Sequence, residues 1–226
     1  MQSTTTKLTG EFIGTLFLVA TVVGSGIMAE RLAAGNDAVA LLGNTLATGV
    51  MLAVLITVIR SLSGAHFNPA VSVTFWVRKE LSHSLTSLYL IVQILGGICG
   101  TWLAHVMFDV EILQTSTNPR LSVGTFVAEI VATFGLVATI LGTLRVNPNW
   151  VGATVGLYIS GAYWFTASTS FANPAVTIAR CLTESFSGIA PMDVAPFVLA
   201  QLVGALLATL CFWMLRRSKR EDGVAD

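Results

Sequence analysis

Long apolar stretches separated by short polar connections dominate this chain. Six of them are long enough, at about 20 residues each and 1.5 Å rise per residue, to cross a bilayer as helices. They cover approximately Leu8–Met28, Val39–Ile59, Leu85–Phe108, Val123–Leu144, Trp150–Ala167 and Ala195–Leu215. The fifth stretch is the shortest of the six. The pattern therefore predicts an all-α membrane protein with six transmembrane helices.

Two further apolar segments, Asn68–Val77 and Asn173–Leu182, would be about 15 Å long as helices, which is half the hydrocarbon thickness. Both begin with Asn-Pro-Ala-Val. Asn is a favourable N-cap, and Pro suits the first helical position, where its missing N–H costs nothing. Hydrocarbon offers no partner to the first N–H groups of a helix, so a start inside the membrane needs such a cap. We therefore predict two re-entrant half helices.

Similar sequences recur in the two halves of the chain. Leu18–Thr21 and Leu136–Thr139 are both Leu-Val-Ala-Thr, and the two Asn-Pro-Ala-Val motifs begin 105 residues apart. Three spans per half is an odd number, so the halves, about residues 8–108 and 123–215, must be inverted relative to each other. We predict a single transmembrane channel domain over residues 1–226, in which the half-helix N-termini meet at the bilayer midplane.

The composition agrees with a membrane protein. Hydrophobic residues make up 54% and charged residues 11% of the chain, whereas soluble domains carry about 25% charged residues. The zero net charge argues against a nucleic-acid partner. Cys99, Cys181 and Cys211 lack the spacing of metal ligands, so we expect no metal site and no cofactor. The sequence contains no nucleophile–base set or phosphate-binding loop, which argues against an enzyme.

Lys and Arg are distributed unequally between the two sides of the predicted bundle. The side of both termini carries Lys7, Arg60, Arg78, Lys79, Arg145, Arg216, Arg217, Lys219 and Arg220. The other side carries only Arg31, Arg120 and Arg180. The positive-inside rule therefore predicts a multi-pass protein of the cell membrane with both termini in the cytoplasm.

The predicted midplane has a defined electrostatic character. Two opposed helix N-termini concentrate a partial positive charge of about +0.5 each. The amides of Asn68 and Asn173 can also donate hydrogen bonds to a solute there. A neutral solute with lone pairs is favoured, whereas a cation meets repulsion in addition to its desolvation cost. The sequence thus predicts a channel for water or small uncharged hydroxylated solutes.

The segment Ser63–Val71, Ser-Gly-Ala-His-Phe-Asn-Pro-Ala-Val, resembles the first signature of the aquaporin (major intrinsic protein) family. The six spans and one glutamate in the first span of each half, Glu11 and Glu129, extend the resemblance over about residues 8–215. It implies a right-handed bundle in the lipid bilayer, a homotetramer with one pore per protomer, and passive conduction without a cofactor. The motif residues it assigns to the pore are Asn68, Pro69, Ala70, Asn173, Pro174 and Ala175.

The chain departs from the family pattern at the outer constriction. Members usually carry Arg directly after the second Asn-Pro-Ala, but this chain has Val176. Counting from the motifs without gaps places the other constriction positions at Thr48, Gly161 and Ser170. Water-selective relatives have bulky aromatic and histidine side chains there, whereas these are small. We therefore predict a wide, weakly polar filter, as in aquaglyceroporins.

The resemblance makes metalloid hydroxides such as arsenite, their methylated forms, glycerol-like polyols and urea the candidate solutes, together with some water. Thr177 stands where glycerol facilitators usually carry Asp, which favours the metalloid acids. An alternative is a water-selective aquaporin in which Arg180, one turn after Val176 on the same helical face, replaces the missing arginine. We favour a position of Arg180 at the outer interface, where it would cap the half helix.

Three further residues have candidate roles. His66, just before the first motif, is expected to line the inner vestibule. Glu11 and Glu129 are ionisable groups inside spans, which suggests function. They either relay protons in a proton-coupled secondary transporter or accept the N–H groups of the loop ahead of each half helix. Their matched placement favours the structural role.

Overall fold

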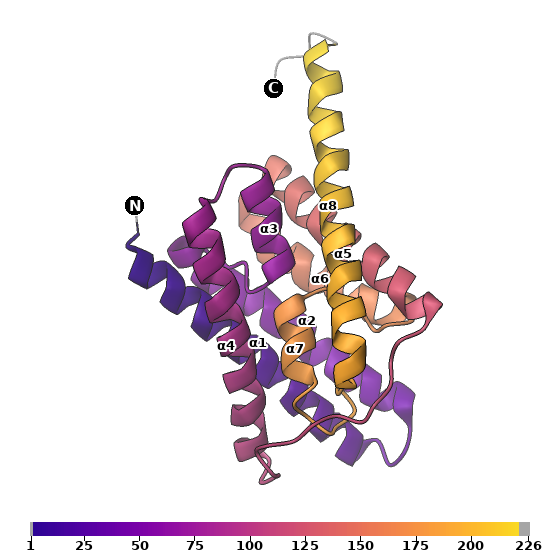
Figure 1. Cartoon of the computed structure of the whole chain (residues 1–226). Coiled ribbons are helices and arrows are strands. Elements are labelled where there is room, and N and C mark those ends of the chain that lie inside the picture. The colour runs from indigo at the N-terminus through magenta and orange to yellow at the C-terminus, as the bar shows by residue number, and fades with distance from the viewer. Residues whose placement is uncertain (1, 222–226) are drawn as a thin grey trace.

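The computed structural model describes residues 2–221, and the side chains of residues 2–215. Within this part the chain forms eight α-helices and one 3₁₀ turn (Figure 1). They are α1 (Thr4–Leu32), α2 (Asp37–Ser63), α3 (Pro69–Val77), α4 (His83–Met107), α5 (Val123–Val146), η1 (Pro148–Trp150), α6 (Val151–Phe165), α7 (Pro174–Arg180) and α8 (Pro191–Glu221). Both ends of the predicted domain, and the side chains of Arg216, Arg217, Lys219 and Arg220, lie outside the described residues.

Five helices of the described chain, α1, α2, α4, α5 and α8, are long and apolar enough to cross a membrane. The fifth predicted span is shorter than expected, because α6 has 15 residues and ends at Phe165. This length is about 22 Å, less than the hydrocarbon thickness of about 30 Å. Non-helical residues 166–173 continue from its end, and most of them are buried in the protein. Irregular backbone at membrane depth is tolerated only where protein or a cavity surrounds it.

The two half helices begin where the Asn-Pro motifs predict. The Asn68 side chain accepts a hydrogen bond from the N–H of Ala70 at 2.9 Å, and Pro69 is the first residue of α3. The Asn173 side chain accepts from the N–H of Ala175 at 3.0 Å and caps α7 in the same way. Each cap thus satisfies a donor that has no partner within its own helix.

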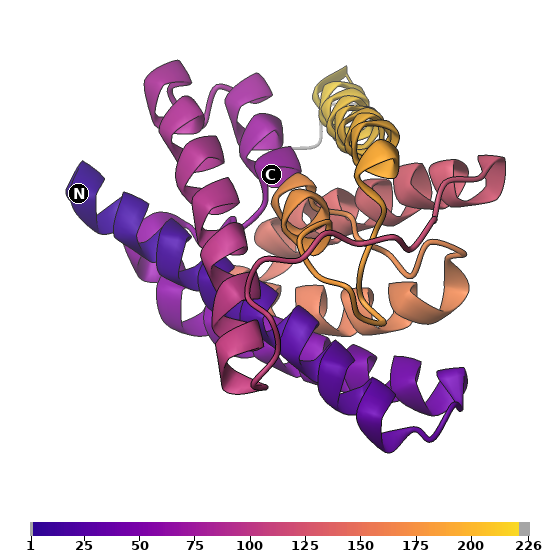
Figure 2. The same ribbon diagram turned by 60° about the horizontal axis from the view of Figure 1, so that its bottom comes forward.

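The halves pack in corresponding ways. Helix α1 lies against α2 and α4, α5 lies against α6 and α8, and α2 and α6 join the halves. A Cβ atom on Gly96 of α4 would lie 2.5 Å from the Phe12 carbonyl oxygen of α1, and one on Gly204 of α8 would lie 2.3 Å from that of Ile130 of α5. Glycine therefore permits the same close helix contact in each half. Both views place α3 and α7 next to each other between the longer helices (Figures 1 and 2).

Candidate functional site

The side chains that cap the half helices also connect the two halves of the chain. The Asn68 amide donates a hydrogen bond to the Ala172 carbonyl oxygen at 2.7 Å, and the Asn173 amide donates to that of Phe67 at 2.8 Å. Each acceptor directly precedes the other Asn. The two helix N-termini therefore lie side by side, and each amide nitrogen retains a second N–H.

The loops before the two motifs have a strained backbone. Phe67 and Ala172, the residues before each Asn, have left-handed φ values of 49° and 46°. Such a conformation costs about 1–2 kcal/mol for a residue other than glycine. It persists only where the surrounding structure fixes it.

The two buried glutamates supply this support. Glu11 accepts hydrogen bonds from the backbone N–H groups of the two residues before Asn68, at 2.9 and 2.7 Å. Glu129 accepts from the two residues before Asn173, at 2.8 and 2.9 Å. The side-chain amides of Gln93 and Gln201 donate to the same carboxylates, at 2.8 and 2.6 Å. These are the contacts that the structural alternative requires.

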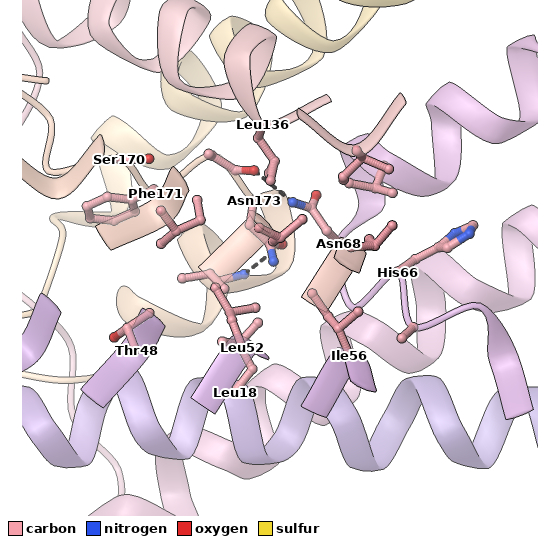
Figure 3. A pocket seen from close by; sticks show the side chains of 18 of the residues that line it. Leu18, Thr48, Leu52, Ile56, His66, Asn68, Leu136, Ser170, Phe171 and Asn173 are labelled. Atoms are coloured by element: carbon pink, nitrogen blue, oxygen red, sulfur yellow. Dashed lines mark hydrogen bonds between the residues drawn. The ribbon is translucent and has the colours of Figure 1, made fainter. Parts of the chain in front are cut away.

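A cavity of about 200 Å³ runs past the half-helix N-termini (Figure 3). Helices α2 and α6 line it with one residue per turn: Thr48, Leu52, Ile56 and Arg60 from α2, and Val151, Val155, Ile159 and Tyr163 from α6. The α2 stretch is about 18 Å long at 1.5 Å per residue. Leu18 of α1 and Leu136 of α5 contribute apolar walls. The cavity is therefore elongated and mostly apolar, with few polar groups.

Polar groups occur at three levels of this cavity. In Figure 3 His66 lies at one end, Asn68 and Asn173 lie in the middle, and Thr48 and Ser170 lie at the other end. The His66 ring stacks on Phe75 with 4.7 Å between centroids, and its Nδ1 is 3.1 Å from the Ser72 hydroxyl. These contacts hold the imidazole at the end of the cavity nearer the chain termini.

Three of the four expected filter residues, Thr48, Ser170 and Val176, line the cavity, but Gly161 does not. Gly161 is exposed, and a Cβ atom built on it meets no atom within 4 Å. Residues two positions apart on a helix differ by about 200°, so Gly161 faces away from the side of Ile159 and Tyr163.

The lining residue of this region of α6 is instead Tyr163, which is buried and donates a hydrogen bond to the Thr48 hydroxyl at 3.4 Å. The filter is therefore narrower here than the small residues in the sequence predict. The prediction of Gly161 is wrong because a count back from the second Asn-Pro-Ala motif fixes a residue number, but not which side of α6 that residue occupies. The four-residue spacing of Val151, Val155, Ile159 and Tyr163 was the signal that identifies the cavity side.

The expected position of Arg180 at the outer interface is also wrong. Its side chain is only 2% exposed, and its Nε donates a hydrogen bond to the Ser187 carbonyl oxygen. The guanidinium carbon lies 3.5 Å from the centroid of the Phe171 ring. Arg180 lines the cavity and also a second hollow beyond it, which Glu30, Asn44, Thr117, Arg120 and Glu184 help to line. It therefore stands between the two spaces.

An all-helical membrane bundle whose half helices meet beside an elongated cavity defines a transmembrane channel of the type with six spans and two re-entrant segments. The family model described as "MIP: Major intrinsic protein" matches residues 1–165. The chain belongs to this family, the aquaporins, and the resemblance seen in the sequence is confirmed. Members of the family are channels, so the protein is not an enzyme.

The chain is similar to named relatives over most of its length. It is 51% identical to the aquaglyceroporin AqpS of Rhizobium meliloti, over 95% of this chain and 92% of that protein. It is 30% identical to the aquaporin AqpM of Methanothermobacter marburgensis, over 95% and 99% of the two chains. The X-ray structure of the aquaglyceroporin from Plasmodium falciparum has the same fold, with a TM-score of 0.75, 23% identity and coverage of 92% and 95%.

Proposed function

We propose that this channel conducts neutral solutes larger than water passively, with metalloid hydroxides such as arsenite and glycerol-like polyols as its solutes, together with some water. The observation that carries the proposal is Val176, which lines the cavity where family members usually carry Arg. An arginine would present up to five donors and fill the lumen, whereas valine offers only methyl groups. The relative AqpS is named an aquaglyceroporin, which supports a solute larger than water.

The cavity walls suit solutes with both hydroxyl and apolar surface. The α2 and α6 stripes contribute methyl groups, and the amides of Asn68 and Asn173 contribute donors. The Ser170 hydroxyl lines the same cavity and has no hydrogen-bond partner in the described structure. A polyol or an undissociated metalloid acid can exchange its hydration for these groups without carrying charge past the helix N-termini.

The distribution of Lys and Arg supports an orientation in the membrane, and membership of the aquaporin family supports an oligomeric assembly. We infer that both termini lie in the cytoplasm, because the side of the termini carries nine basic residues and the other side three. We also infer a homotetramer in the cell membrane with one pore in each protomer. Protease protection in inverted and right-side-out vesicles tests the orientation, and cross-linking in membranes tests the tetramer.

The experiment that tests the proposed solutes is stopped-flow measurement of glycerol, arsenite and water flux into proteoliposomes. The Val176→Arg variant should lose most glycerol and arsenite flux. Val146→Arg, which adds the same side chain at an 88% exposed position at the end of α5, should behave as wild type. Equal solute flux through Val176→Arg and wild type would refute the wide-filter proposal.

A second candidate is a water-selective pore, which the buried position of Arg180 at the end of the cavity favours. The same assay distinguishes the two functions. Fast water flux with glycerol and arsenite flux equal to that of protein-free liposomes would establish the second candidate.

A further inference from the structure

The proposed size selection at Val176 leaves the guanidinium group of Arg180 without a role. Among the residues that the structure describes, its Nη1 atom is buried and makes no hydrogen bond. The side chain lines both the cavity and the hollow beyond it. A buried donor without a partner costs about 1–3 kcal/mol. The unpaired donor is explained if its N–H group forms a hydrogen bond with a solute that passes between the two spaces.

The position of the guanidinium is fixed on two sides. One face covers the Phe171 ring, and Nε donates to the Ser187 carbonyl oxygen. Phe171 in turn packs edge-to-face on Phe197, with 5.3 Å between centroids. Stacking on an aromatic ring fixes the plane of an arginine, which a lysine in this place could not match.

Arg120 positions the acceptor of Arg180. It donates from Nε to the Gly188 carbonyl oxygen at 2.5 Å and from Nη2 to that of Phe186 at 2.7 Å. These two residues flank Ser187, so Arg120 holds the carbonyl group that orients Arg180. Its guanidinium carbon also lies 5.4 Å from the Phe171 ring centroid, which brings a second positive charge to the same place.

Neither guanidinium forms an ion pair with a carboxylate in the described part of the protein, where the ion pair found is Arg78–Glu80. Glu30, Asp37 and Glu184 line the hollow beyond Arg180, where Glu30 and Glu184 accept hydrogen bonds from the backbone N–H groups of Phe186 and Thr117. Their negative charges lie within the hollow and are not paired with either guanidinium. The positive charge that a cation meets is therefore the guanidinium of Arg180 itself, at the point where the hollow joins the cavity.

We propose that Arg180 is the charge filter of this channel. Its guanidinium group excludes cations and offers an N–H donor to neutral solutes. Arg180 lies about 6 Å farther along α7 than Val176. Selection by charge and selection by size are then made at two different positions, so the pore excludes cations although Val176 leaves it open to larger molecules. The inference rests on the proposed function, because it assumes that neutral solutes pass.

The test compares urea with guanidinium, which have nearly the same planar shape but differ by one charge. Their fluxes are measured in proteoliposomes that contain wild type, Arg180→Met, Arg180→Gln or Arg180→Lys. The matched control is Arg31→Met, because Arg31 also lies over a ring, that of Phe108 at 5.3 Å, but lines neither the cavity nor the second hollow.

Removal of the charge in Arg180→Met and Arg180→Gln should raise guanidinium flux relative to urea flux by about tenfold or more, since a unit charge a few ångströms away acts through weak screening. Arg180→Lys should keep most of the exclusion, and Arg31→Met should equal wild type. The Gln variant keeps a polar side chain and so separates loss of charge from loss of folding.

An unchanged urea-to-guanidinium ratio in a folded Arg180→Gln or Arg180→Met channel, with unaltered elution and circular dichroism, would overturn the inference. The proposed function fails in a different way. In that case wild type itself passes urea, glycerol and arsenite no faster than protein-free liposomes.

Discussion

Replacement of Glu11 by Gln tests the main structural support of the channel centre. One carboxylate oxygen accepts from the Ser63 hydroxyl and the His66 N–H, and the other accepts from the Phe67 N–H and the Gln93 amide. Gln is of equal size, but one of these oxygens becomes an NH₂ group that faces two donors. Two buried hydrogen bonds to a charged acceptor are lost, at about 1.5–3 kcal/mol each.

The expected loss in the free energy of unfolding is therefore about 3–6 kcal/mol, out of a total that is about 5–15 kcal/mol for most proteins. This corresponds to a fall in the melting temperature of about 6–24 °C for a chain of this size. Neutral-solute flux should fall as well, because the Phe67 carbonyl group that orients Asn173 loses its support. Glu129→Gln should have a similar effect in the other half.

Thermal unfolding of the detergent-solubilised protein and solute flux in proteoliposomes measure the two effects. The control is Glu80→Gln, which breaks the surface ion pair with Arg78 and should cost no more than about 1 kcal/mol. An unchanged melting temperature in Glu11→Gln would refute the structural role. If flux also fell only in the presence of a proton gradient, the proton relay would be the correct alternative.

Three further results are expected. Tyr163→Ala should increase the flux of polyols larger than glycerol several-fold, whereas Gly161→Ala should not, because of these two residues only Tyr163 lines the cavity. Swelling of proteoliposomes in polyol solutions measures both fluxes, and equal effects of the two variants would contradict the orientation of α6. Gly96→Val should abolish stable expression, since a Cβ atom would lie 2.5 Å from the Phe12 carbonyl oxygen; detergent gel filtration would detect a folded variant and so disprove this. Collapse of the proton gradient with an ionophore should leave glycerol influx unchanged, and a loss of rate would indicate coupled transport.

The features that the sequence predicted correctly depend on local chemistry. A half helix that starts at Asn68 or Asn173 is encoded by one capping side chain and the proline after it. The long spans are encoded by apolar length, so α1, α2, α4, α5 and α8 appear where the hydropathy places them. Helix ends differ by a few residues, because caps such as Ser3 and Ser82 lie in polar segments before the apolar stretches.

The features that the sequence did not predict depend on distant contacts. A count from the motif predicts Gly161 in the filter, but the direction of a side chain on α6 depends on where that helix ends. The tendency of arginine at a helix end to reach the interface predicts an outer position for Arg180, whereas the structure buries it. Its actual partners, Phe171 and Ser187, belong to loops on either side of α7. Arg120, which lies before α5, donates hydrogen bonds to the carbonyl oxygens of the two residues that flank Ser187. No pattern within the half helix reports these contacts.

The two halves of the channel share the same backbone arrangement around the half helices, but different side chains occupy corresponding positions in it. Positions 105 residues apart correspond, so Asn68 matches Asn173, His66 matches Phe171, and Phe75 matches Arg180. The first half stacks His66 on Phe75, and the second stacks Arg180 on Phe171. A stacked pair thus borders the cavity in both halves, but only the pair of the second half contains a permanently charged side chain. An internal repeat can therefore keep a symmetric scaffold, held by matched Asn and Glu side chains, and still place a charged side chain at a position of the second half where the first half has an aromatic ring.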